Sequence, residues 1–299
     1  RYQGRVRTTG GRFGFVNTDD GKQFFIAPDE MEKLLPGDVI EFRVEPAGEG
    51  KEQAFTEKLV STELNEFFGR YIIRDKGHFI EPDHNTLNRW IFVPPAARNQ
   101  AEEGDFVAAH ITKHPYPAGK VQAAIDTVIG KPDDEHIENR FIKAKFHIAD
   151  AFDDEVNAEA QALTAQDTHA LSSERTDLTH LPFVTIDSAN TRDIDDALYA
   201  EALSEGWTLW VAIADPAALI APDSALDRAA QQRTTSVYLP DQVIPMLPAE
   251  LSEQLCSLQE GENRLAMVAE LKVLEDDSID QLHIHNALIR SHAKLSYQQ

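Results

Sequence analysis

The chain has 299 residues, of which 42% are hydrophobic and 26% are charged, a balance typical of a folded globular protein with room for two or three domains. Its formal net charge of −23 disfavours a nucleic-acid partner unless local basic grooves or bound cations reverse the field. The single cysteine, Cys256, excludes an internal disulfide and argues against a cysteine-based zinc site, and no apolar run of about eighteen residues predicts a membrane span. We therefore expect a cytoplasmic monomer with neither a disulfide partner nor a membrane.

The first third of the chain repeats itself. The similar pairs are GRVRTTGGRFGFV (4–16) with GRYIIRDKGHFIE (69–81), FFIAP (24–28) with IFVPP (91–95), and PGDVIEFRV (36–44) with EGDFVAAHI (103–111). The offset is 65 residues for the first pair and 67 for the others, which indicates two tandem domains, 1–60 and 61–129, rather than a solenoid. In each unit, short alternating strands separated by glycine turns predict a small β-barrel of the OB type.

An aromatic strand pair marks the first unit. GRFGFV followed by QFFI resembles the cold-shock domains, which are OB folds whose exposed rings stack RNA bases beside basic side chains. The residues to which this resemblance assigns RNA contact are Phe13, Phe15, Phe25, Arg5, Arg7 and Arg12. The alternative is that alternate aromatics fill the barrel core. The second unit has fewer aromatics at these places, so we expect less base contact there. GEGKE (48–52) lacks the residues of a phosphate-binding loop and predicts an ordinary loop.

The pattern changes near residue 130, where GKPDDEH (130–136) ends the strands. The segments NRFIKAKF and AFDDEVNAEAQALTAQ have helical spacing, and SALDRAAQQRTTSVYL and IPMLPAELSEQLCSL each predict a helix next to a turn or extended segment. FVTID, WTLWVAIADP, LAMVAELKVLEDD and IDQLHIHNALIRSH predict strands, the last two joined by a charged turn. We therefore assign 130–299 to an α+β domain. Because the chain starts at Arg1 and stops at Gln299 without a helix-ending signal, we expect a piece of a longer protein.

TIDSANTRDIDD (185–196) gathers Asp187, Asp193, Asp195 and Asp196 between two apolar segments, opposed only by Arg192. Two carboxylates about 5 Å apart repel by roughly 3 kcal/mol at an effective dielectric near 20. The side chains can escape into water, take up protons or bind divalent cations. The apolar flanks favour cations, and all-oxygen ligands favour Mg²⁺ or Mn²⁺ over zinc. An EF-hand is excluded, since Leu198 stands where its glycine is required. The better match is a carboxylate-lined site for two-metal phosphodiester hydrolysis.

Four segments together resemble the catalytic domain of the RNase II / RNase R exoribonucleases, and DSANTRDIDDAL is closer to the RNase II branch. They are FVTIDSANTRDIDDALYAE, VAIADP, RTTSVYLPDQVIPMLPAELSEQLCSL and SHAKLSY. The two cold-shock-like units match that family's arrangement as well. The resemblance implies two OB-type barrels followed by a partial α+β catalytic domain that hydrolyses single-stranded RNA from its 3′ end to nucleoside 5′-monophosphates with Mg²⁺.

The same resemblance implies a role for individual residues. Asp187 and Asp196 would bind metal directly, while Asp193 and Asp195 would hold a second metal or orient the attacking water. Tyr238 would stack on the 3′ end of the RNA and Tyr297 would contribute to sugar recognition, unless either is a packed core ring. The family's catalytic domain continues beyond residue 299, so we expect weak or no activity from this portion alone.

Two other functions stay open from the sequence. The chain could be an RNA-binding protein with an inactive or incomplete nuclease domain, which the presence of all four aspartates disfavours. It could also be a structural cation-binding protein, which the repeated barrels disfavour. His283 and His285 lie on one strand face and could bind a metal, but without a third such ligand nearby we expect a surface or packed pair.

Overall fold

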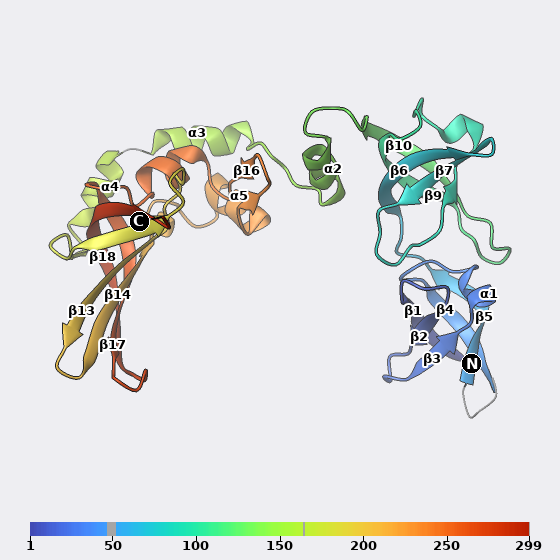
Figure 1. Ribbon diagram of the computed structural model, residues 1–299, viewed down its shortest axis with the longest axis horizontal. Coiled ribbons are helices and arrows are strands. Elements are labelled where there is room, and N and C mark those ends of the chain that lie inside the picture. Colours follow the sequence, from blue (N-terminus) through green and yellow to red (C-terminus); the bar gives the residue numbers. More distant parts are fainter. Residues whose placement is uncertain (47–51, 164, 299) are drawn as a thin grey trace. The chain divides into compact units, whose positions relative to one another are not determined.

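The computed structural model describes residues 1–46, 52–163 and 165–298, which divide into two units, Arg1–Ala149 and Asp150–Gln299 (Figure 1). Residues 48–51 of the predicted loop lie outside the described residues. Among the helices of the described residues, none combines the length and the apolar character that a membrane crossing requires. The domain boundaries expected at residues 60 and 130 stay predictions.

The first barrel closes in the strand order β1-β2-β3-β5-β4. Its strands are β1 (Tyr2–Thr8), β2 (Gly14–Asn17), β3 (Gln23–Ile26), β4 (Val39–Pro46) and β5 (Glu52–Ser61), with the short helix α1 (Pro28–Met31) after β3. Strand alternation turns Val6, Phe24 and Phe42 into a core that excludes water. Gly4 is required on β1, because a Cβ there would meet the Asn17 carbonyl oxygen at 2.5 Å.

The second barrel closes in the order β10-β8-β7-β6-β9. Its strands are β6 (Glu66–Arg74), β7 (Gly77–Pro82), β8 (Ile91–Phe92), β9 (Phe106–Lys113) and β10 (Gln122–Gly130), with the 3-10 turn η1 (Pro95–Ala97). Helix α2 (Ile137–Lys145) packs on this barrel, where the Phe141 ring lies 5.0 Å from that of Phe106 and 6.2 Å from that of Phe68. The two predicted OB-type barrels are therefore confirmed, and the first unit extends past them to residue 149.

The Gly-Asp turn that precedes the fourth strand of each barrel shows the repeat at atomic detail. Gly37 and Gly104 have φ of 83° and 95°, values that glycine adopts without strain. Each following aspartate is buried and accepts a hydrogen bond from the backbone N–H three residues earlier, at 2.7 Å from Leu35 to Asp38 and 2.7 Å from Glu102 to Asp105. The sequence repeat therefore encodes the same turn twice.

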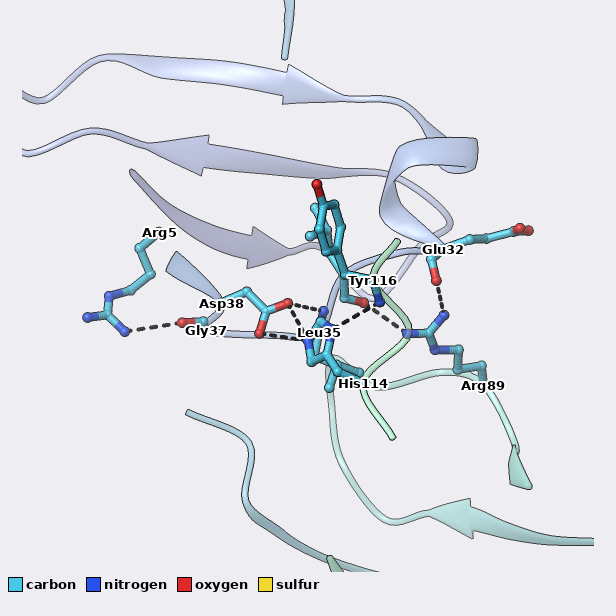
Figure 2. A network of polar contacts seen from close by, with 9 residues as sticks. Arg5, Glu32, Leu35, Gly37, Asp38, Arg89, His114 and Tyr116 are labelled. Carbon is cyan, nitrogen blue, oxygen red and sulfur yellow. Dashed lines mark hydrogen bonds and ion pairs between the residues drawn. The ribbon is translucent and has the colours of Figure 1, made fainter. Parts of the chain in front are cut away.

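A network of polar contacts fastens the two barrels to each other (Figure 2). The backbone N–H of Tyr116 donates to Nδ1 of His114 at 3.0 Å, so Nε2 carries the proton and donates to buried Asp38 at 3.0 Å. Arg89 donates to the Leu34 carbonyl at 2.9 Å and to that of Glu32, and the Tyr116 hydroxyl donates to the Glu57 carbonyl at 2.8 Å. The second barrel thus supplies donors to carbonyls and a carboxylate of the first.

The second unit is built on a six-stranded sheet in the order β11-β18-β12-β13-β14-β17, in which β17 also pairs with β18. The strands are β11 (Thr176–Asp177), β12 (Phe183–Asp187), β13 (Asp196–Leu203), β14 (Gly206–Ala214), β17 (Asn263–Val273) and β18 (Ile279–Ser296), and β15 (Val237–Tyr238) and β16 (Val243–Ile244) form a separate pair. The helical elements are α3 (Asp154–Ala162), α4 (Ala165–Ser172), η2 (Pro216–Ala218), α5 (Ala225–Arg233) and the π-helical turn η3 (Glu250–Leu255). The predicted α+β character is confirmed.

The sheet has two apolar faces. One face carries Phe183, Trp210 and Ile289, which are buried in the core of the unit. On the opposite face, Ile213 pairs with Met267 across β14 and β17, and Ile284 pairs with Ala269 across β18 and β17. Ile213, Met267 and Ile284 are about half exposed. Strands that carry apolar residues on both faces are typical of a sheet that is covered on both sides.

Candidate active site and RNA-binding surface

The acidic loop spans the gap between two neighbouring strands of the sheet. Asp187 is the last residue of β12 and Asp196 is the first of β13, so Asp193 and Asp195 lie in the connection. The backbone N–H of Ala214 donates to the Asp195 carbonyl at 2.8 Å, which ties the end of the loop to β14. Asp187 is in parallel register with Ser296 of β18, and the backbone N–H of Tyr297 donates to its carbonyl at 3.3 Å. The fold thereby brings the KLSY segment beside the acidic loop.

The carboxylates of this loop perturb one another. Burial raises the pKa of Asp187, and the charge of Asp196 raises it further, while the Lys294 ammonium opposes the shift. Partial desolvation also raises the pKa of Asp195, with Asp196 and Asp193 adding to the effect. The Oδ2 atom of Asp187 is buried and has no hydrogen-bond partner among the described residues. Part of the acidic loop is therefore turned inward rather than spread into solvent.

The donor set fits a hard cation in kind, since it consists of carboxylate oxygens and includes one buried oxygen without a partner. However, within the described residues no three acidic, histidine or cysteine side chains are grouped as the ligands of a metal ion. The assembled magnesium site that the sequence predicts is thus not present as a finished coordination shell. His285 instead bonds Glu270 at 2.8 Å, and the exposed His283 ring lies 6.5 Å away, as expected for a surface or packed pair.

Both candidate tyrosines are exposed, at 68% for Tyr238 and 77% for Tyr297, which excludes the alternative that they are packed core rings. The Tyr238 hydroxyl donates to Oδ2 of Asp193 at 3.0 Å. Although the ring is exposed, partial desolvation near the loop raises the pKa of the phenol, and the hydrogen bond to Asp193 raises it further. Tyr238 reaches the loop from β15, which is held by its pairing with β16. An aromatic ring thus stands beside the carboxylates with its hydroxyl anchored to one of them.

Three phenylalanines of the first barrel form a cluster outside its core. The ring centroids lie 6.0 Å apart for Phe13 and Phe15, 5.6 Å for Phe13 and Phe25, and 6.0 Å for Phe15 and Phe25. Their neighbour Phe24 points the other way, into the core. The structure therefore brings together the rings that the sequence assigned to RNA and not the one that fills the barrel. Contact with RNA stays a prediction.

The arginines near this cluster differ in their surroundings. Arg7 is in register with Phe15, which is in register with Phe25, so the three residues form one row across β1, β2 and β3. Arg5 instead forms an ion pair with Glu63 and donates to the Gly37 carbonyl at 3.3 Å. Arg12 lies in the exposed turn between β1 and β2 and lines a cavity of about 660 Å³ at the junction of the barrels. Of the arginines considered, Arg7 has the position best suited to a phosphate beside the rings.

A second aromatic cluster lies on the second barrel. The Phe79 ring lies 6.0 Å from that of Trp90 and 5.9 Å from that of Phe92, and Arg74 stands 6.0 Å from the Trp90 ring. Phe79 and Phe92 face each other across β7 and β8, as Phe15 and Phe25 do across β2 and β3. The repeat contained the signal, because Phe92 of IFVPP occupies the place of Phe25 in FFIAP.

Comparison with known proteins agrees with this arrangement. Family models match residues 4–59 (Ribonuclease B OB domain), 79–153 (Cold shock domain) and 175–299 (RNB domain). Exoribonuclease 2 of Proteus mirabilis is 39% identical over 304 aligned residues, which cover 99% of this chain and 46% of that protein. The chain thus spans about half the length of this relative.

Solved structures give the same result for the fold. RNase R of Mycoplasma genitalium, in complex with ribose-methylated single-stranded RNA, superposes with a TM-score of 0.78 at 28% identity, covering 99% of this chain and 48% of that one. The yeast pseudonuclease Ssd1 superposes with a TM-score of 0.70 at 15% identity, covering 100% of this chain and 44% of that one, and so shares the fold.

Proposed function

We propose a function on one premise: the chain belongs to the RNB family of exoribonucleases and corresponds to the N-terminal part of its relatives. The proposed activity is hydrolysis of single-stranded RNA from the 3′ end to nucleoside 5′-monophosphates, with Mg²⁺ or Mn²⁺ as the cofactor. We expect the protein to act as a monomer in the cytoplasm.

The two barrels would guide the RNA strand. Exposed aromatic rings stack on bases of any identity, each stacked base being worth about 1–3 kcal/mol, so this grip does not restrict the sequence that is degraded. Phe13, Phe15 and Phe25 with Arg7 offer such a grip on the first barrel. Phe79, Trp90 and Phe92 offer a second one, beside Arg74, whose guanidinium also pairs with Glu103 at 3.0 Å. Local basic side chains beside the rings are what an acidic protein needs in order to bind a polyanion.

The acidic loop would act on the terminal phosphodiester. Asp187, Asp193, Asp195 and Asp196 are the proposed metal and catalytic residues, and bound Mg²⁺ would activate water and offset the charge that develops on the phosphate. Tyr238 would stack on the last base while its hydroxyl remains bonded to Asp193. Tyr297, which follows the strand paired with Asp187, would contact the terminal sugar. A group that positions the end of the chain within reach of the reacting atoms contributes through orientation.

The observation that carries this proposal is the buried Oδ2 of Asp187, which has no hydrogen-bond partner among the described residues, in a loop where burial, reinforced by the neighbouring carboxylates, raises the pKa of Asp187 and of Asp195. A buried charge without a partner is costly, and a cation is the partner that would relieve all the carboxylates together.

One observation favours a second function, RNA binding by an inactive or incomplete nuclease domain. Within the described residues, no three acidic, histidine or cysteine side chains are grouped as the ligands of a metal ion. Under this alternative the barrels would still bind single-stranded RNA, but the strand would not be shortened.

The two functions are separated by incubating 5′-labelled single-stranded RNA with Mg²⁺ and either the 299-residue chain or its Asp195→Asn variant. The substitution removes one carboxylate charge with little change in shape. Stepwise shortening by the parent and not by the variant supports the nuclease. Retarded but intact RNA with both proteins supports RNA binding by an inactive or incomplete nuclease domain, and RNA that is neither bound nor shortened contradicts both functions.

A further inference from the structure

Two side chains, Ser257 and Lys294, hold the backbone of the acidic loop. Neither is one of the proposed catalytic carboxylates or RNA-binding tyrosines. The first is Ser257, in the LCSL segment, which is 1% exposed. Its hydroxyl donates to the Arg192 carbonyl at 2.6 Å and accepts from the backbone N–H of Ile194 at 3.2 Å. One hydroxyl therefore bonds the backbone on both sides of Asp193. The Leu258 N–H extends the contact by donating to the Ile194 carbonyl at 2.9 Å.

The second side chain is Lys294, which lies near the C-terminal end of β18. Its ammonium donates to the Ala189 carbonyl at 3.2 Å and to that of Thr191. Its own backbone is fixed twice, by register with Thr185 of β12 and by donation of its N–H to Glu260 at 3.1 Å. Lys294 therefore holds the first half of the loop, while Ser257 holds the second half.

These contacts matter because the loop has few bonds of its own. Residues 188–195 contain no helix or strand, and their four neighbouring carboxylates repel one another. A loop under such repulsion opens toward water unless other groups hold its backbone. A buried hydroxyl that satisfies one donor and one acceptor at once, and a cation placed among carbonyls near the carboxylates, both oppose that opening.

We propose that Ser257 and Lys294 are positioning residues that hold the backbone of the acidic loop, and with it the carboxylates proposed to bind a divalent cation. The inference rests on the proposed function, since it assigns these residues a purpose in the same site. Neither residue is among the proposed metal-binding or RNA-binding residues. Ser257 acts through the backbone on either side of Asp193, and Lys294 acts through the turn that follows Asp187.

The structure offers a matched control for each residue. Ser252 is a half-buried serine of the same region, but its hydroxyl bonds only the carbonyls of Leu247 and Pro248 within its own turn, at 3.4 and 3.3 Å. Lys272 lies on β17, which pairs with β18, and its ammonium contacts Asp280 at 3.1 Å in solvent. The test set is therefore Ser257→Ala with Ser252→Ala, and Lys294→Met with Lys272→Met. Lys294→Arg is a conservative variant that retains the charge.

Two measurements on the full chain decide the proposal. Amide hydrogen exchange reads the loop directly, and the Ile194 amide should lose its protection in Ser257→Ala while the amides of β14 and β17 keep theirs. Titration with Mn²⁺, followed by electron paramagnetic resonance, reads the site. Groups that orient metal ligands change metal affinity by roughly 10- to 100-fold, so we expect losses of that size in Ser257→Ala and Lys294→Met, partial recovery in Lys294→Arg and no change in the two controls.

The outcomes separate this inference from the proposed function. Unchanged hydrogen exchange at the Ile194 amide in Ser257→Ala would overturn the claim that Ser257 holds the loop, whatever the Mn²⁺ affinity of the variant. Altered exchange with unchanged Mn²⁺ affinity would make the two residues structural and overturn their positioning role. If the parent chain binds no Mn²⁺, the proposed metal site fails and the positioning role fails with it, while the exchange data still show whether the loop is held.

Discussion

The buried aspartates of the two barrels offer a stability experiment with a built-in control. Asp38 is 0% exposed and accepts hydrogen bonds from the Leu35 N–H at 2.7 Å and from His114 Nε2 at 3.0 Å. Asp105, at the same place in the second repeat, is 3% exposed and accepts from the Glu102 N–H at 2.7 Å. Each aspartate thus accepts an equivalent hydrogen bond from the backbone of its own barrel. Only Asp38 accepts a second hydrogen bond, from His114 of the other barrel.

Each buried donor that loses its acceptor costs about 1–3 kcal/mol. Asp38→Ala leaves the Leu35 N–H and His114 Nε2 without their acceptor, and should lower the free energy of unfolding of the first unit by roughly 2–6 kcal/mol. Asp105→Ala abandons one such donor and should cost roughly 1–3 kcal/mol. The excess for Asp38 measures its link to His114, and therefore to the second barrel.

Urea unfolding followed by pulsed hydrogen exchange reads peptides of each barrel separately, which avoids a single two-state fit to a chain of two units. A double-mutant cycle with His114→Ala should give a coupling of about 1–3 kcal/mol for Asp38 and none for Asp105. Equal losses in the two aspartate variants, or a coupling of Asp38 to His114 below about 0.5 kcal/mol, would refute the view that this pair fastens the barrels together.

Three further predictions concern the surface, the site and the core. Phe15→Ala should weaken single-stranded RNA binding by about 1–3 kcal/mol in fluorescence anisotropy without unfolding the barrel. Phe24→Ala should instead destabilise the barrel by about 3–5 kcal/mol, and the reverse pattern would show that the rings have been assigned to the wrong faces. Because the pKa values of Asp187 and Asp195 are raised in the folded chain, the metal-free second unit should lose stability as pH rises through them. Asp187→Asn should reduce that loss, and a urea midpoint with the same pH profile in parent and variant would contradict the shift. Burial raises the pKa of the Cys256 thiol to about 12, so this thiol should react with a disulfide reagent at pH 8 only after unfolding. Rapid reaction of the native chain would argue that the helical turn around Cys256 opens.

The barrels could be predicted because their signals are local and occur twice. A glycine with positive φ followed by an aspartate that bonds the backbone three residues earlier needs no distant partner, so the repeat of PGD and EGD carries the turn with it. Strand alternation likewise separates Phe24 from Phe25. Such features depend on only a few neighbouring residues, so they can be predicted from the sequence. The prediction of two OB-type barrels and an α+β domain is confirmed.

The features that the sequence did not reveal depend on distant partners. The sequence around Arg5 gives no sign of the ion pair with Glu63 that the fold brings within reach of its guanidinium, and RNA contact by Arg5 stays a prediction. The segment LCSL gives no local sign that the Ser257 hydroxyl bonds the backbone of Arg192 and Ile194, because these residues are distant in the sequence. Whether the carboxylates group as metal ligands depends on the directions of their side chains. Mutual repulsion and a bound ion together determine these directions, so the spacing of the aspartates in the sequence does not predict them.

The most direct test of the central claim is a Mn²⁺ titration of the chain, followed by electron paramagnetic resonance, in the parent, in Asp187→Asn and in the control Asp177→Asn, whose carboxylate bonds Thr179 on the surface. The account predicts saturable binding by the parent, at least about tenfold weaker binding by Asp187→Asn, and no change in the control. Absence of saturable binding, or equal affinity in all three proteins, would contradict the claim that the acidic loop exists to hold a divalent cation.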